Sequence, residues 1–222
     1  ILVITASIIV FLLLNILLGS VSIPFASVWN ILTGGEGDPI AWQNIILKSR
    51  LPQALTALVA GAGLSISGLQ MQTIFRNPLA GPSVLGISSG ASLGVAFVVL
   101  LSGQLGGVAL SRLGFIGEVA LSIAAIAGAL SVMGLIVLAS RKVAGSVTLL
   151  IIGVMIGYIA NAVIGVLKFF SVEEDIKAYV IWGLGSFARV SGNQMMLFVT
   201  IMAVIIPLSF LLIKPLNLLM LG

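Results

Sequence analysis

The stretch RLPQALTALVAGAGLSISGLQMQTIFRNPLAGPSVLGISSGASLG, residues 50–94, decides the fold of this chain. Two apolar runs without a charged residue, 51–75 and 82–101, are joined here by a short polar segment, Arg76-Asn77-Pro78-Leu79-Ala80-Gly81. An α-helix rises about 1.5 Å per residue, so roughly 20 residues cross the ~30 Å hydrocarbon core of a bilayer. Both runs reach this length. The stretch therefore predicts two membrane helices joined by a tight turn.

Small residues are spaced along both runs so that helices can approach closely. Lipid provides no hydrophobic drive between helices, so close backbone packing has to hold them together. Gly86, Gly90 and Gly94 recur every four residues on one face of the second run, and Gly61 lies in a similar series in the first. Pro82 suits the first turn of the second helix, where its missing N–H costs nothing. We expect these four glycines to pack helices together inside a bundle.

Several polar and small residues of this stretch form a recognisable signature. They are Arg50-Leu51-Pro52, Ser67-Gly68 with Met71-Gln72, Arg76-Asn77-Pro78-Leu79-Ala80 and Leu85-Gly86-Ile87-Ser88-Ser89-Gly90-Ala91. The combination resembles the hallmark region of the FecCD-type permeases, the membrane subunits of ATP-driven importers for iron-siderophores, haem and cobalamin. The resemblance covers residues 50–94 and depends on non-apolar positions, which makes it more specific than hydrophobicity alone.

Composition places the whole chain in a membrane. Of the 222 residues, 60% are apolar and 7% are charged, and the mean hydropathy is +1.30, which excludes a soluble globular protein. The predicted fold class is all-α, a polytopic membrane helical bundle. The absence of cysteine and histidine removes disulfides, thiolate chemistry and the commonest transition-metal ligands. We expect no metal site, so iron or cobalt would cross only inside a chelator.

Six apolar runs predict six membrane-spanning helices. They cover residues 1–19, 51–75, 82–101, 115–139, 147–166 and 195–213. Segment 168–187, with the acidic run Glu173-Glu174-Asp175, predicts a surface helix against the bundle, and 27–32 predicts a short interfacial helix. The chain begins without a methionine, so we expect a fragment: one permease domain over residues 1–222. The resemblance implies about ten helices in the full chain, of which the C-terminal ones and the coupling helices are missing here.

The orientation of the helices is not settled by charge alone. With six spans, one side holds four basic residues and no acid, whereas the other holds six basic residues and all six acids. The positive-inside rule counts basic residues and so does not favour placing the first side in the cytoplasm, although net charge does. The resemblance implies a cytoplasmic N-terminus, and we adopt that orientation.

The resemblance implies a gate and a pathway in the fifth predicted helix and the turn before it. In the family, the loop before this helix narrows the cytoplasmic end of the pathway, which implies a cytoplasmic gate at Ala144, Gly145, Ser146 and Val147. A plain turn is an equally good interpretation for any one of them. The fifth helix faces the central cavity in the family, which implies a substrate pathway along Gly153, Gly157 and Asn161. The glycines could instead pack helices, and Asn161 could form an interhelical hydrogen bond worth about 0.6 kcal/mol.

Arg50 is the candidate residue for docking an extracytoplasmic binding protein. In the family, arginines of an R-L-P-R motif look like docking points for glutamates of that protein, and a desolvated arginine–carboxylate contact provides orientation. Here Gln53 replaces the second arginine, so the prediction rests on Arg50 alone. The alternative is an arginine that anchors the helix end by reaching toward the lipid headgroups.

Two enzymatic interpretations fail on their own requirements. Residues 86–90, Gly-Ile-Ser-Ser-Gly, match the G-x-S-x-G motif of serine hydrolases, but the motif needs a histidine base and a strand–turn–helix setting. Glycine packing explains the pattern. The chain also lacks a G-x-x-x-x-G-K-[ST] loop, so it has no cofactor of its own and any ATP would be bound by a partner subunit.

The resulting hypothesis is a permease subunit, not an enzyme, of an ATP-driven importer. It would carry an iron chelate (siderophore or haem) or cobalamin by alternating access. The implied partners are a second permease subunit, most simply in a homodimer, a cytoplasmic ATPase dimer, an extracytoplasmic binding protein and membrane lipid, with no nucleic acid. The implied location is the inner membrane of a prokaryote. The alternative is an ion-coupled secondary transporter, which would normally place an ionisable residue in mid-membrane.

Overall fold

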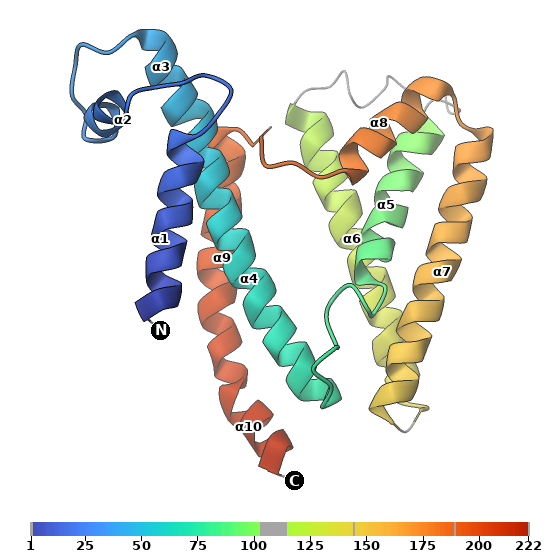
Figure 1. Cartoon of the computed structure of the whole chain (residues 1–222). Coiled ribbons are helices and arrows are strands. Elements are labelled where there is room, and N and C mark those ends of the chain that lie inside the picture. The colour runs from blue at the N-terminus through green and yellow to red at the C-terminus, as the bar shows by residue number, and fades with distance from the viewer. Residues whose placement is uncertain (1, 103–114, 144, 189, 222) are drawn as a thin grey trace. The chain divides into compact units, whose positions relative to one another are not determined.

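The computed structural model of the chain is built from helices (Figure 1). It describes residues 2–102, 115–143, 145–188 and 190–221, and no strand occurs among them. The helices are α1 (Leu2–Leu17), α2 (Phe25–Leu32), α3 (Ile40–Ile45), a π turn η1 (Ile46–Arg50), α4 (Leu51–Phe75), α5 (Ile87–Ser102), α6 (Phe115–Ser140), α7 (Ser146–Phe170), α8 (Glu173–Gly183), α9 (Gly192–Ser209), a 3₁₀ turn η3 (Phe210–Leu212) and α10 (Ile213–Leu221). The predicted all-α class is confirmed.

The six predicted spans correspond to six apolar helical segments in the part of the chain that the structure describes. Four are long and apolar enough to cross a membrane: residues 40–75, 117–140, 146–170 and 192–220. Residues 2–17 and 87–101 form two shorter apolar helices. The surface helix and the interfacial helix predicted from the sequence correspond to α8 and α2.

The start of α5 differs from the prediction. We expected Pro82 in the first turn of this helix, but residues 82–86 form turns and the helix begins at Ile87. Gly86 has a φ of +71°, a left-handed conformation that ends any regular helix and that glycine adopts without steric cost. Its N–H donates to the carbonyl of Ser83 at 3.2 Å, as in a tight turn. The expectation about Pro82 was wrong because it ignored the conformational freedom of Gly86.

The described residues divide into two compact units, and the division falls within α4. The first unit contains Ile1–Ile66 and Ser186–Ile213, and the second contains Ser67–Gly185 and Lys214–Gly222. Whether the two form the single permease domain predicted over residues 1–222 stays a prediction.

The first unit has a core of aliphatic side chains from α1, α2, η1 and the start of α4. Its buried residues are Ile16, Ile23, Val28, Ile31, Ile46 and Ala54. In the same unit α9 begins with a capping box, in which the side chains and backbone N–H groups of Ser191 and Gln194 bond reciprocally.

In the second unit α5 packs against α6, α7 and α8 (Figure 1). The α5–α6 contact is made by main chain on main chain. A Cβ atom added at Gly94 would lie 2.1 Å from the carbonyl oxygen of Ala124, and one at Gly128 would lie 2.1 Å from that of Gly90. No side chain larger than hydrogen fits between these backbones, so the glycines determine how closely the two helices approach.

The turn after α4 is a Schellman motif with an arginine where glycine is usual. The N–H of Asn77 donates to the carbonyl of Gln72 at 3.1 Å and the N–H of Arg76 to that of Thr73 at 3.2 Å. Arg76 has a φ of +46°, which is uncommon for a residue with a side chain. The Asn77 side chain accepts from the N–H of Leu79 at 2.9 Å. These bonds account for the tight turn that the sequence predicts.

The surface helix α8 is fixed to α5 through Tyr179. The tyrosine ring is buried among Val95, Leu100 and Ile164. Burial raises the pKa of the Tyr179 hydroxyl, and a hydrogen bond with the Ser92 side chain partly offsets that rise. The ammonium of Lys168 lies 4.8 Å from the ring centroid, a cation–π contact between the end of α7 and α8.

We predict that Gly94→Ala lowers the thermal stability of the purified protein in detergent. The added Cβ would force α5 away from Ala124, and overpacking of this kind costs about 1–3 kcal/mol. Gly134→Ala is the matched control, because Gly134 is exposed on α6 and nothing lies within 4 Å of its added Cβ. Equal melting temperatures for the two variants would contradict the main-chain contact.

Candidate functional site

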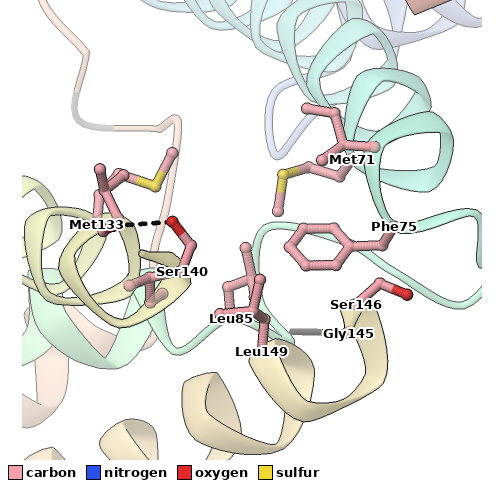
Figure 2. Close-up of a pocket in the computed structure, with 11 residues that line it drawn as sticks. Met71, Phe75, Leu85, Met133, Ser140, Gly145, Ser146 and Leu149 are labelled. Carbon is pink, nitrogen blue, oxygen red and sulfur yellow. Dashed lines mark hydrogen bonds between the residues drawn. The ribbon is translucent and has the colours of Figure 1, made fainter. Parts of the chain in front are cut away.

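The turn between α6 and α7, predicted as a gate, borders a cavity of about 370 Å³ in the second unit. The end of α4, the approach to α5, the end of α6 and the start of α7 line it. Figure 2 shows the side chains of Met71, Phe75 and Leu85 next to one another at this cavity. The full lining is Met71, Ile74, Phe75, Leu85, Met133, Ile136, Val137, Ser140, Gly145, Ser146 and Leu149. Its surface is mostly aliphatic and aromatic, with two serine hydroxyls at the turn.

The predicted gate residues have different surroundings. Gly145 precedes the first residue of α7 and has a φ of +118°, a conformation that a larger residue would rarely adopt. Ser146, half-buried, and Gly145 both line the cavity, whereas Val147 is 64% exposed and does not. Ala144 lies outside the described residues. Their role as a gate stays a prediction.

The three predicted pathway residues do not share one face of α7. Gly153 and Gly157 are buried against the start of α5: a Cβ at Gly153 would lie 2.8 Å from the Leu85 Cα, and one at Gly86 would lie 2.6 Å from the Gly153 carbonyl oxygen. Asn161 lies on the exposed side of the helix. A spacing of four residues suggests that these positions form one stripe along the helix. Four residues advance by slightly more than one helical turn, so each position is rotated about 40° around the helix axis from the one before. The two glycines therefore form helix contacts, and a pathway role stays a prediction that fits Asn161 better.

The four glycines predicted to pack helices fall into two groups. Gly86 lies against α7, and Gly90 and Gly94 lie against α6, each too close to a neighbouring backbone for a side chain. Gly61 is exposed, and nothing in the part of the chain that the structure describes lies within 4 Å of a Cβ built on it. A packing role for Gly61 stays a prediction, since no described helix covers its face of α4.

Arg50, the predicted docking residue, is buried in the first unit and is only 6% exposed. Its Nη1 donates to the carbonyl oxygens of Ile16 at 2.9 Å and Leu17 at 3.0 Å, and its Nη2 donates to that of Val21 at 2.5 Å. The last carbonyls of a helix have no partner within the helix, and a cation is favourable there. Arg50 therefore supplies the C-terminal cap of α1.

The chain around Arg50 is built to admit this side chain. The π turn η1 directly precedes α4 and ends at Arg50. Gly19 provides the space on the other side, because a Cβ there would lie 2.6 Å from the Arg50 Nη2. Sequence reasoning missed Gly19, which carries no motif. Its only signal in the sequence was its place as the last residue of the first apolar run, residues 1–19.

The acidic run at the start of α8 is not uniformly solvated. Glu173 and Glu174 are exposed, whereas Asp175 is 6% exposed and its Oδ2 has no hydrogen-bond partner among the described residues. Three carboxylates in the first turn are favourable to the helix dipole.

The described residues contain no group of three or more His, Cys, Asp or Glu side chains that could hold a metal ion. What they form is a set of apolar helices joined through glycine backbones, several of them long enough to cross a membrane. This arrangement defines the class: a multi-pass helical membrane protein. The sequence model of the FecCD transport family matches residues 7–222. The chain belongs to that family.

The relatives are transport permeases. The chain is 32% identical over 206 residues to the hemin transport system permease protein HmuU of Yersinia pestis, covering 92% of this chain and 58% of the relative. It is 36% identical over 188 residues to the vitamin B12 import system permease protein BtuC of Salmonella paratyphi A, and the match covers 84% of this chain and 52% of that relative. The chain thus spans just over half the length of these relatives.

A solved structure has the same fold. It is described as a metal-chelate type ABC transporter in an inward-facing conformation, with a TM-score of 0.77 and 27% sequence identity. The match covers 98% of this chain and 63% of the other. The resemblance over residues 50–94 therefore extends over nearly the whole chain.

We predict that Arg50→Ala lowers the free energy of unfolding by about 1–3 kcal/mol, because it leaves buried carbonyls at the end of α1 without a donor. Arg50→Lys should restore only part of the loss, since a single ammonium cannot reproduce the fork of a guanidinium. Lys48→Ala, an exposed cation two residues earlier, is the control. Wild-type stability of Arg50→Ala, combined with weaker binding of an extracytoplasmic partner, would instead support the docking role.

Proposed function

We propose that this chain is part of a permease subunit of an ATP-driven importer for an iron chelate, either a siderophore or haem, or for cobalamin. Family membership and the printed functions of the hemin and vitamin B12 permeases support this proposal. The single observation that carries it is the match of the family over residues 7–222. Of the three candidate cargoes, we expect a siderophore first, haem second and cobalamin third.

The proposed mechanism is alternating access. A partner ATPase dimer binds ATP in the cytoplasm and shifts a pair of permease subunits, most simply two copies of this protein, between outward-open and inward-open states. An extracytoplasmic binding protein delivers the chelate. The location is the inner membrane of a prokaryote. This chain does no covalent chemistry; it supplies a weakly polar path that holds its cargo loosely enough to release it.

The exposed side of α7 is the proposed pathway surface. Asn161 lies there with Tyr158, which is 71% exposed, and Met155, which is 58% exposed. An amide and a phenol on an otherwise apolar helix face offer hydrogen bonds to a chelate without a fixed charge to trap it. The proposed gate lies at the start of the same helix, at residues 144–147.

An ion-coupled secondary transporter is the alternative, and the positions of the acids argue against it. Within the described helices, Glu118 lies in the first turn of α6 and the other acids of the second unit lie in the first turn of α8. None occupies the middle of a described span, where proton or sodium coupling normally places one.

We predict that deletion of the complete gene abolishes one energy-dependent uptake. The deletion strain would be offered labelled ferric siderophores, haem and cobalamin separately, with and without depletion of ATP. Loss of one uptake, restored by the gene, would support the importer and identify its cargo. Persistence of all three, in a strain without a redundant system, would contradict the proposed cargo.

A second prediction concerns the gate. Residues 1–222 contain no cysteine, so Ser146→Cys, made in a complete protein whose other cysteines are all changed to serine, introduces a single thiol at the start of α7 in each copy. If two copies meet at this gate, oxidative crosslinking should block uptake, and dithiothreitol should restore it. Val172→Cys, exposed between α7 and α8, is the control. Unimpaired uptake by the crosslinked Ser146→Cys protein would exclude the gate.

A further inference from the structure

The lining of the cavity at the α6–α7 turn is suited to the acyl chain of a lipid. Its volume of about 370 Å³ lies in the ~300–1,000 Å³ range of small-molecule sites. Two methionines, Met71 and Met133, contribute flexible side chains that adapt to an irregular apolar guest. The rim is open, since Ile74 is 48%, Met133 40% and Val137 45% exposed.

The cavity lies where helices end. Phe75 is the last residue of α4, Ser140 the last of α6 and Ser146 the first of α7, and all three line it. Because α4, α6 and α7 are candidate membrane spans, their ends lie at the level where hydrocarbon meets headgroups. An apolar cavity at that level is bordered by acyl chains on one side and phosphates on the other.

Two exposed cations lie in the turn between residues that line this cavity. Arg141 and Lys142 lie between Ser140 and Gly145, which both line it. Their backbone N–H groups already donate to the carbonyls of Leu138 and Ala139 within the turn, at 3.3 and 2.9 Å. No ion pair joins either side chain to another residue of the described part, so both charges are available to an external anion.

Charge is separated along the second unit. The acids among its described residues are Glu118 at the start of α6 and the run 173–175 at the start of α8. Both positions are a full helix length from the turn, because α6 ends and α7 begins at the cavity. The cavity end, with Arg76, Arg141 and Lys142, is therefore purely cationic over the described residues.

From these observations we infer that the cavity binds an anionic phospholipid, with an acyl chain against Met71, Phe75 and Met133 and the phosphate on Arg141 and Lys142. The apolar lining selects the chain and the cations select the headgroup charge. Gly145 and Ser146 line the same cavity, so the bound chain contacts the predicted gate. The inference concerns lipid, not cargo, and holds whichever chelate is carried.

The test uses the complete gene product in phosphatidylcholine nanodiscs containing a phosphatidylglycerol with a photoactivatable group near the end of one acyl chain. After illumination, mass spectrometry locates the labelled residues. We expect adducts on the side chains that line the cavity, and competition by unlabelled phosphatidylglycerol but not by phosphatidylcholine. Since the readout is labelling, a failed uptake assay and a failed lipid assay are distinguishable.

Two pairs of variants sharpen the result. Removing both cations with Arg141→Gln and Lys142→Gln should reduce cavity labelling about fivefold for each charge. The control changes Lys48 and Lys177, exposed cations elsewhere, to Gln in the same way. Val137→Trp should block the mouth of the cavity and reduce labelling. Leu135→Trp is the control and should leave labelling unchanged, because Leu135 lies on the same helix, is 52% exposed and does not line the cavity.

Three results would overturn the inference. One is labelling that phosphatidylcholine competes for as well as phosphatidylglycerol does. Another is labelling of unchanged strength when both cations are removed and when Val137 is tryptophan. The third is no adduct at the cavity, which would mean that other parts of the complete protein fill it.

Discussion

The contact of α5 with its neighbours through bare backbone is the constraint on which the second unit depends. Gly90 and Gly94 touch α6, and Gly86 touches α7, at distances where a single methyl group would collide with a carbonyl or a Cα. In lipid, dispersion and close approach replace the hydrophobic effect between helices, so the packing of α5 depends on this contact. The position of the α6–α7 turn, and with it the cavity, follows from how α6 and α7 lie against α5.

The first unit depends on a different interaction, a buried guanidinium among main-chain oxygens. Three carbonyls around the end of α1 converge on Arg50, and Gly19 leaves the space for it. A charge away from water is costly unless its donors are satisfied, and here helix-end carbonyls satisfy them. An arginine at the end of a membrane helix can thus hold its own protein together, and position alone does not separate that role from docking.

The sequence predicted those features that depend on local pattern. The lengths of the apolar runs gave the six helical segments, and Arg76 to Gly81 gave the turn. Features that depend on which segment, distant in the sequence, packs against a given helix face were not predictable. Gly61 and Gly94 each belong to a series of small residues that recur every four positions. Among the described residues, however, only Gly94 faces another helix. Likewise, nothing in the sequence shows that Met71 and Leu149 border one cavity.

The cap formed by Arg50 also has a consequence for the environment that the protein tolerates. Its acceptors are peptide carbonyls rather than carboxylates, so the contact contains no acid that protonation could neutralise. Buried charges are also screened little by dissolved salt. Whichever side of the membrane this corner faces, acidification or a change in ionic strength leaves it intact, whereas a surface ion pair at the same place would weaken.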